Sequence, residues 1–381
     1  MTSFTFSSLV LVSSLLAVLG NDITDRLFDA PQQIHLSSAS RTSFRVSWKT
    51  KNITASVCSY GLEEHLLNSK AVGDDGVQYL AGHGYHHSVL LSDLPLNKQY
   101  FYSCGDGENK VNMSPVIAFN TAPTPTQTVS MAFLGDWGYL DSDARPMDLG
   151  IGGLALNWTA TLTRELLETL KDQNAIDLVF ITGDIGYADD SFGHKRENLR
   201  AGYEPCYDGF MEWHQNVSSI MPLMVAPGNH ESECHDPYCL LHLNDTGLPL
   251  SNFSAYNTRF SMPSAESDGV MNMWYSFEWG PVHVTSINTE TDFPGAGEEK
   301  TGDGHFPFLP AGGFAADGEY MAWVEKDLAR ASTNPEVKWI VACGHRPFED
   351  LPSDNQQQLA ALFKKYGVAM YFAGHGHTYI R

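Results

Sequence analysis

The residues best suited to chemistry lie in five short blocks, each of which places Asp, Tyr, Asn or His beside glycine. The blocks are Gly135-Asp136-Trp137-Gly138, Gly183-Asp184-Ile185-Gly186-Tyr187, Gly228-Asn229-His230-Glu231, Cys343-Gly344-His345 and Gly374-His375-Gly376-His377. Carboxylate, phenolate, amide and imidazole groups together form a donor set that suits a pair of metal ions. Two such ions can activate water and neutralise phosphate oxygens, so the blocks indicate metal-assisted hydrolysis.

Each block follows a short apolar run with the composition of a buried β-strand. The runs are Ser130 to Leu134, Leu178 to Thr182, Leu223 to Ala226, Trp339 to Ala342 and Ala369 to Ala373. In an open α/β sheet, the loops at the carboxyl ends of the strands converge on one crevice. We therefore expect the five blocks to meet in space.

The order and spacing of these blocks over residues 129 to 381 resemble the purple acid phosphatases, within the metallophosphoesterase superfamily. The style is that of their high-molecular-weight fungal and plant members. The resemblance implies a binuclear site in which Asp184 bridges two metals. Asp136, Asp184, Tyr187 and His377 would hold the first metal, and Asp184, Asn229, His345 and His375 the second. It also implies that a metal-activated hydroxide hydrolyses phosphate monoesters.

The first metal site carries a further implication about the identity of its ion. Gly138 stands where other metallophosphoesterases usually carry a histidine, and Tyr187 replaces that ligand. A phenolate prefers a hard, highly charged ion, which favours Fe³⁺. The second metal ion is expected to be divalent: Zn²⁺, Mn²⁺ or Fe²⁺. Such a pair stays slightly positive beside three anionic ligands and a hydroxide, which suits a bound phosphate.

Four residues near the predicted ligands are expected to assist them. By resemblance, His230 protonates the leaving oxygen as a general acid. Glu231 is expected to orient a ligand or a water from behind the metals. Arg346 lies in a His-Arg-Pro sequence similar to fungal members, where plant members carry a His pair. It either clamps the substrate phosphate or forms a surface salt bridge, and His194 is a second candidate for substrate contact.

Residues 129 to 381 alternate predicted strands with helical segments, which indicates a layered α/β domain. One expected helix places Leu162, Leu166 and Leu170 on a common apolar face. His283, inside an apolar run, is expected to be a core histidine. The acidic stretch from Glu290 to Glu299 is expected to be a solvated loop.

Residues 30 to 122 have no helical period and show short alternating runs separated by turns. This pattern is typical of a β-sandwich of immunoglobulin or fibronectin type III kind. Thr121 to Thr128, with Pro123 and Pro125, reads as a stiff linker. The predicted fold class is thus an all-β sandwich followed by an α/β metallophosphoesterase fold.

Several features favour secretion. Leu9 to Leu19 form an apolar run too short to span a bilayer, so residues 1 to 20 are predicted to be a signal peptide. Six Asn-x-Ser/Thr sequons are expected glycosylation sites: Asn52, Asn112, Asn157, Asn216, Asn244 and Asn252.

Six cysteines fit an oxidising compartment. Cys58 with Cys104 and Cys234 with Cys239 are possible disulfides, whereas Cys343 is expected to be a free core thiol. A Cys–His metal site at Cys234, His235 and Cys239 is disfavoured, because no second ligand pair has finger-like spacing.

The formal charge of −22 argues against nucleic-acid and anionic-membrane partners, because a negative field repels polyanions. The expected partner is a small phosphate ester, and the oligomeric state stays open. Two alternatives compete with an acid phosphatase: a nucleotide pyrophosphatase or phosphodiesterase, and a catalytically weak secreted glycoprotein. The resemblance also implies strands after His377, so the chain is expected to be shortened at its C-terminus.

Overall fold

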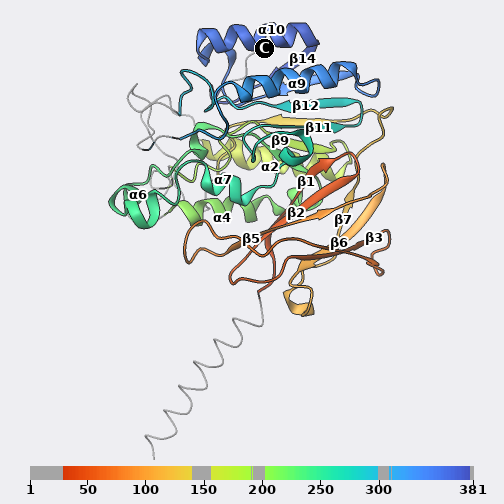
Figure 1. The fold of residues 1–381 in the computed structure, drawn as a ribbon. Helices are drawn as coiled ribbons and strands as arrows, with labels where there is room; N and C mark the ends of the chain where they lie inside the picture. Colours follow the sequence, from red (N-terminus) through yellow and green to blue (C-terminus); the bar gives the residue numbers. More distant parts are fainter. Residues whose placement is uncertain are drawn as a thin grey trace, which may run out of the picture.

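The computed structural model describes residues 29–139, 156–189, 191, 202–298, 309 and 311–377. Within them, an N-terminal β-sandwich precedes an α/β domain (Figure 1), which confirms the predicted fold class. The predicted signal peptide and His194 lie outside the described residues.

The N-terminal domain consists of two antiparallel sheets, in the orders β1-β2-β5 and β4-β3-β6-β7. Its strands are β1 (Gln32–Ser40), β2 (Ser43–Thr50), β3 (Val57–Gly61), β4 (Ser69–Val72), β5 (Tyr85–Leu91), β6 (Gln99–Gly105) and β7 (Ile117–Asn120). Phe44 of β2 packs edge-on against Phe119 of β7, so the aromatic core lies between the two sheets. The expected disulfide between Cys58 and Cys104 joins the paired strands β3 and β6.

The second domain contains a parallel sheet, β10-β9-β8, and a mixed sheet, β11-β12-β13-β14. Its strands are β8 (Met131–Leu134), β9 (Leu178–Ile181), β10 (Leu223–Val225), β11 (Tyr275–Trp279), β12 (Val282–Ser286), β13 (Trp339–Cys343) and β14 (Val368–Phe372). Only the β11–β12 pair is antiparallel. Each of the five predicted strand runs is confirmed, so the five blocks do follow strands.

Helices flank these sheets. They are α2 (Leu156–Asp172), α4 (Tyr203–Trp213), α5 (Gln215–Ser218), α6 (Pro237–Leu241), α7 (Ser254–Arg259), α8 (Ser264–Ser267), α9 (Glu319–Thr333) and α10 (Ser353–Tyr366). Short helical turns are η1 (Lys110–Asn112), η2 (Asn229–Glu231), η3 (Leu243–Gly247) and η4 (Phe348–Asp350). Figure 1 shows α9 and α10 stacked beyond the β12 side of the mixed sheet, and α9 contacts both β12 and β13. Among the residues that the structure describes, no helix combines the length and apolarity needed to cross a membrane.

The expected helix with Leu162, Leu166 and Leu170 on one face is present as α2, but this face is not the buried one. Leu162 and Leu166 are 55% and 56% exposed, whereas Ala160 and Leu167 are buried. Ala160 and Leu167 are seven residues apart and therefore share a different face of the helix. Because α2 carries apolar residues on two faces, periodicity alone could not select the buried one. The selected face contacts the metal-loop region, where the Trp137 indole donates a hydrogen bond to the Ala160 carbonyl.

The predictions for Cys234, Cys239 and Cys343 are confirmed. Cys234 and Cys239 form a disulfide across the start of α6, which excludes the cysteines as metal ligands. Cys343 is buried and free at the end of β13. Cys206, on α4, is half-buried, and its Sγ lies 3.7 Å from the Gly186 carbonyl oxygen.

The β-sandwich packs against the α/β domain through strand β1, which contacts α4, α5, β10 and β11. A buried polar cluster reinforces this contact. Arg259, from α7, donates to Glu204 of α4 at 2.8 Å and to the Tyr79 hydroxyl of the sandwich at 2.7 Å. Lys49, on β2, pairs with Asp208 at 2.6 Å. These ion pairs neutralise acidic groups of α4 that would otherwise be costly to bury.

His283 on β12 is a core histidine, as expected, and it is fully buried between two carboxylates. Its Nε2 lies 2.9 Å from Asp327 and its Nδ1 lies 3.2 Å from Glu278. Burial by itself lowers the pKa of this imidazole, but hydrogen bonds with Asp327 and Glu278 outweigh it and raise the pKa to about 9. Below that pH the ring is an imidazolium that joins β12 to α9.

The interaction of His283 with Asp327 and Glu278 predicts that the protein loses stability at alkaline pH. Because the folded pKa of about 9 exceeds the ordinary 6.5, the contribution is fully present below pH 6.5 and is lost as pH rises through about 9. Replacing His283 by Gln should cost about 3 kcal/mol at pH 6, since it removes the buried imidazolium and leaves Arg330 as the cationic partner of Asp327. Thermal unfolding of both proteins should show the difference narrowing toward pH 10.

His65→Gln is the control, because the His65 side chain is 84% exposed. It should leave the free energy of unfolding unchanged at both pH values. A His283→Gln deficit that stays constant from pH 6 to pH 10 would show that the imidazolium does not contribute.

Candidate metal centre

The five loops after strands β8, β9, β10, β13 and β14 converge, and the predicted ligands fall into two groups of neighbouring atoms. One group contains Asp184, His345 and His375, and the other contains Asp136, Asp184 and His377. Tyr187 and Asn229 lie within hydrogen-bonding distance of these groups. The structure thus brings together all seven residues that the sequence predicted as ligands.

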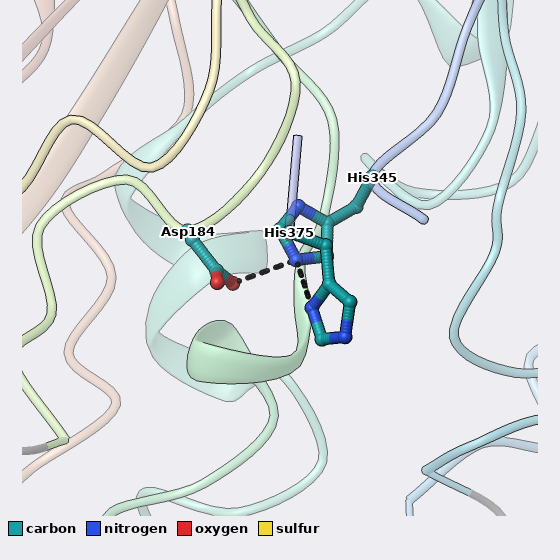
Figure 2. A group of neighbouring side chains, drawn as sticks. All are labelled: Asp184, His345 and His375. Carbon is teal, nitrogen blue, oxygen red and sulfur yellow. Dashed lines mark hydrogen bonds and ion pairs between the residues drawn. The ribbon is translucent and has the colours of Figure 1, made fainter. Parts of the chain in front are cut away.

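In the first group, the other donor atoms surround the Nε2 atom of His345 (Figure 2). This atom lies 3.2 Å from Asp184 Oδ1, 3.2 Å from His375 Nδ1 and 3.0 Å from Asn229 Oδ1. Ligands of one metal ion at about 2.1 Å lie roughly 3 Å from one another, so the spacing suits a cation. His345 Nδ1 lies 2.9 Å from the Thr182 carbonyl. Donation of that N–H directs the Nε2 lone pair toward the group, the tautomer that a metal ligand needs.

The second group surrounds the hydroxyl of Tyr187. This oxygen lies 3.1 Å from Asp136 Oδ1, 3.4 Å from Asp184 Oδ2 and 2.7 Å from His377 Nε2. Asp184 therefore presents one carboxylate oxygen to each group. A carboxylate placed in this way can bridge two ions, so the donor set fits a binuclear centre.

The loops that carry these residues are conformationally strained. Five predicted ligands adopt positive φ angles: Asp136, Asp184, Tyr187, His375 and His377. Gly183 also has a positive φ of 90°, and a Cβ atom there would lie 2.6 Å from His345 Nδ1 and 2.8 Å from Gly228 Cα. Strain of this kind concentrates at functional sites, where the surrounding structure enforces it.

Glu231 connects two of the loops through their backbones. Its Oε2 accepts hydrogen bonds from the N–H groups of Asp184 and Gly228, each at 2.9 Å, and its Oε1 accepts from Ile185 at 2.8 Å. Burial and the nearby charge of Asp184 raise the pKa of Glu231 to about 8. Glu231 thus fixes the distance between the loop bearing Asp184 and the loop bearing Asn229.

The centre is electrostatically coupled. Burial alone would raise the pKa of Asp184, but His345 and His230 bring it well below the usual range. Burial lowers the pKa of His345, yet Asp184 raises it to about 10. Burial and the carboxylates of Asp184 and Asp136 keep the pKa of Tyr187 far above 10. The carboxylates of Asp184 and Asp136 therefore stabilise positive charge in this region.

His230 lies beside this centre with its ring held from behind. Its Nδ1 is 2.7 Å from Asp189 Oδ2, its ring centroid is 4.4 Å from that of Tyr187, and its Nε2 is 3.8 Å from Asp184 Oδ2. Asp189 was not predicted from the sequence. It could have been suspected from its place in the loop after β9, five residues beyond Asp184.

Two expectations about the neighbouring loops are wrong. Glu290 and Glu298 are buried rather than solvated, and Arg346 is buried between them rather than at the surface. Arg346 Nε donates to Glu290 at 2.9 Å and Nη2 to Glu298 at 3.2 Å. The guanidinium offsets one of the two negative charges, while burial and the charge of Glu290 raise the pKa of Glu298 to about 8. Arg346 Nη1 is 3.4 Å from His375 Nε2, and its contact with a substrate phosphate stays a prediction.

The predicted glycosylation sites differ in exposure. Asn52, Asn216, Asn244 and Asn252 are exposed, and Asn157 lies at the start of α2. Asn112 is only 6% exposed, and its Nδ2 donates to Asp106 at 2.7 Å. A glycan at Asn112 would have to extend from a nearly buried side chain. All six sites stay predictions.

Comparison with known proteins agrees with this geometry. Residues 31–121 match the family model described as the purple acid phosphatase N-terminal domain, and residues 130–379 match that of calcineurin-like phosphoesterases. Purple acid phosphatase 23 of Arabidopsis thaliana is 27% identical over 93% of this chain and 74% of its own. Acid phosphatase A of Cryphonectria parasitica is 28% identical over 91% and 74%. Human acid phosphatase type 7 is 29% identical over 92% and 70%.

Among solved structures, purple acid phosphatase PPD1 from yellow lupin seeds has the same fold, with a TM-score of 0.65 and 21% identity. The similarity covers 92% of this chain and 59% of the lupin chain. The two matched domains, in this order, account for nearly all described residues. The chain therefore belongs to the calcineurin-like phosphoesterases and, within them, to the purple acid phosphatases.

Proposed function

We propose that this chain is a secreted acid phosphatase that hydrolyses small phosphate monoesters at a binuclear metal centre. The observation that carries the proposal is the placement of Asp184, whose two oxygens face two separate groups of donors. A single shared carboxylate between two such groups suits two ions held close together.

The two groups differ in the ions that they favour. Fe³⁺ would be held by Asp136, Asp184, Tyr187 and His377. Because the surroundings raise the pKa of the Tyr187 hydroxyl, a highly charged ion is needed to displace its proton. Asp184, Asn229, His345 and His375 would hold a divalent ion such as Zn²⁺, Mn²⁺ or Fe²⁺. When bound, the ions supply Lewis acidity that activates water and neutralises phosphate oxygens.

The residues of the chain supply the remaining steps. Asp189 holds Nδ1 of His230, which leaves Nε2 on the side of the ligand groups. In that position Nε2–H donates a proton to the departing ester oxygen. Glu231 keeps the loops at the required separation by binding their backbone N–H groups. A covalent Ser or Cys nucleophile is not needed.

The acidic composition of the chain is consistent with hydrolysis of phosphate esters at low pH. A formal charge of −22 repels phosphate esters near neutrality, and protonation of carboxylates and histidines weakens that repulsion. The same charge disfavours nucleic acids and anionic membranes as partners. Secretion and glycosylation are part of the proposal, supported by the predicted signal peptide, the exposed sequons and two disulfides.

The reaction class is tested by a direct assay. Purified protein loaded with iron and zinc should hydrolyse phosphate monoesters at pH 5 with a higher kcat/KM than matched diesters of the same alcohol. The comparison distinguishes a monoesterase from a nucleotide pyrophosphatase or phosphodiesterase. A preference for diesters would favour that alternative, and no hydrolysis of either would contradict the proposal.

The identity of the first ion is tested by colour. A Tyr187 phenolate on Fe³⁺ should give a visible charge-transfer band, and Tyr187→Phe should abolish it. The visible spectrum should be recorded with parallel elemental analysis of iron. Tyr79→Phe is the matched control, because Tyr79 belongs to the β-sandwich and contacts none of the predicted ligands in the described structure, so the band should stay intact. A colourless iron-loaded protein would overturn the assignment.

The proton donor is tested by leaving-group dependence. His230→Ala should retain both metals yet lose about 10²–10⁴-fold in kcat/KM toward alkyl phosphates. The loss should be much smaller for nitrophenyl phosphate, whose leaving group needs no proton. An equal loss for both substrates, at unchanged metal content, would show that His230 does not act as the acid.

A further inference from the structure

A second histidine lies behind the proton donor and contacts the same carboxylate. His235 Nδ1 is 2.9 Å from Asp189 Oδ2, the atom that also lies 2.7 Å from His230 Nδ1. One ligand atom from each of the three residues lies within 4.8 Å of the others. Two imidazole nitrogens and a carboxylate oxygen form a donor set that suits Zn²⁺. This cluster is separate from the two groups that share Asp184.

The contacts of Asp189 with both histidines are made by Oδ2, and its second carboxylate oxygen takes no part in them. Its side chain is fully buried, and Oδ1 has no hydrogen-bond partner among the described residues. An unsatisfied, buried carboxylate oxygen is costly, and a cation beside it would remove that cost.

His235 is held in place on its far side by a carboxylate. His235 Nε2 lies 3.2 Å from Glu233 Oε1, and Glu233 Oε2 accepts a hydrogen bond from the Leu309 N–H at 2.9 Å. In metal sites, a ligating histidine almost always donates its other N–H to a carboxylate or carbonyl, which fixes the tautomer and orients the ring. Glu233 places a carboxylate oxygen at ion-pair distance from that nitrogen of His235.

The backbone around His235 is also fixed. The Cys234–Cys239 disulfide closes a short loop that contains His235. Asp236 is buried, and its Oδ2 accepts hydrogen bonds from Ser191 Oγ at 3.1 Å and from the Gly202 N–H at 3.3 Å. The histidine is therefore delivered to Asp189 by a constrained segment.

We propose that Asp189, His230 and His235 form a third cation site, for Zn²⁺ or a similar divalent ion, whose occupation inhibits the enzyme. The inhibitory effect rests on the proposed function, because it follows from the role of His230. A cation bound at both Nδ1 atoms releases their protons to solvent. It leaves His230 as a neutral, metal-bound imidazole, and the N–H at Nε2 is then too weak an acid to protonate a leaving alkoxide.

The site can be counted without an activity assay. Protein carrying two metals per chain is dialysed against increasing Zn²⁺ at one near-neutral pH, and bound zinc is measured by elemental analysis. Wild type should take up one further equivalent, and His235→Ala should not. Glu233→Gln, which keeps all three donors, should bind the additional zinc about 10–100-fold more weakly. His242→Ala is the matched control, because His242 is exposed on the same segment and should leave the third equivalent in place.

The same samples are then assayed with an alkyl phosphate and with nitrophenyl phosphate. Zinc should inhibit wild type and His242→Ala, more strongly with the alkyl ester, and should not inhibit His235→Ala. Uptake of only two metals by wild type, or a third equivalent undiminished in His235→Ala, would overturn the site. Zinc uptake as expected in a protein that hydrolyses neither ester would uphold the site and contradict the proposed function. Melting temperatures identify any variant that fails to fold, and Glu233→Gln then decides the outcome.

Discussion

The arrangement of the candidate metal centre depends on one carboxylate, that of Asp184, which is buried in the loop after β9. An isolated buried carboxylate is strongly unfavourable, so positive groups or cations must surround it. His345 lies near Oδ1 and the Tyr187 hydroxyl lies near Oδ2, while the backbone N–H of His230 donates to Oδ1 at 3.1 Å. The need to compensate this charge explains why four other loops converge on the loop that carries Asp184.

Close approach of these loops requires both small residues and internal ties. Gly183 and Gly228 let the backbones and the His345 ring come within a distance that a side chain would block. Glu231 then links the loops after β9 and β10 by accepting three backbone hydrogen bonds. Because these bonds are made to the backbone, they fix the positions of the Cα atoms from which Asp184 and Asn229 project. Positive φ angles at the ligands are the conformational cost of this arrangement.

Charge compensation at a distance recurs elsewhere in this acidic chain. Arg346 is buried with Glu290 and Glu298, and His283 is buried against Asp327. In each case the partners come from different elements, so folding alone brings them together. Removal of one partner would leave an uncompensated buried charge, which is the costly state. The same principle links the sandwich to the α/β domain through Arg259 and Glu204.

The sequence determined the order of the domains and the five strand-ending blocks, because those features are local: a strand period, a glycine, and a donor beside it. The seven positions predicted as ligands came from the resemblance of these blocks to the purple acid phosphatases. The sequence also indicated His283 as a core residue, since an apolar run surrounds it. Tertiary structure alone decided which face of α2 is buried and that Glu290 and Glu298 lie inside. It also decided that Asp189 and His235 lie behind His230. These outcomes depend on contacts between segments distant in the chain, and spacing along the sequence carries no record of such contacts.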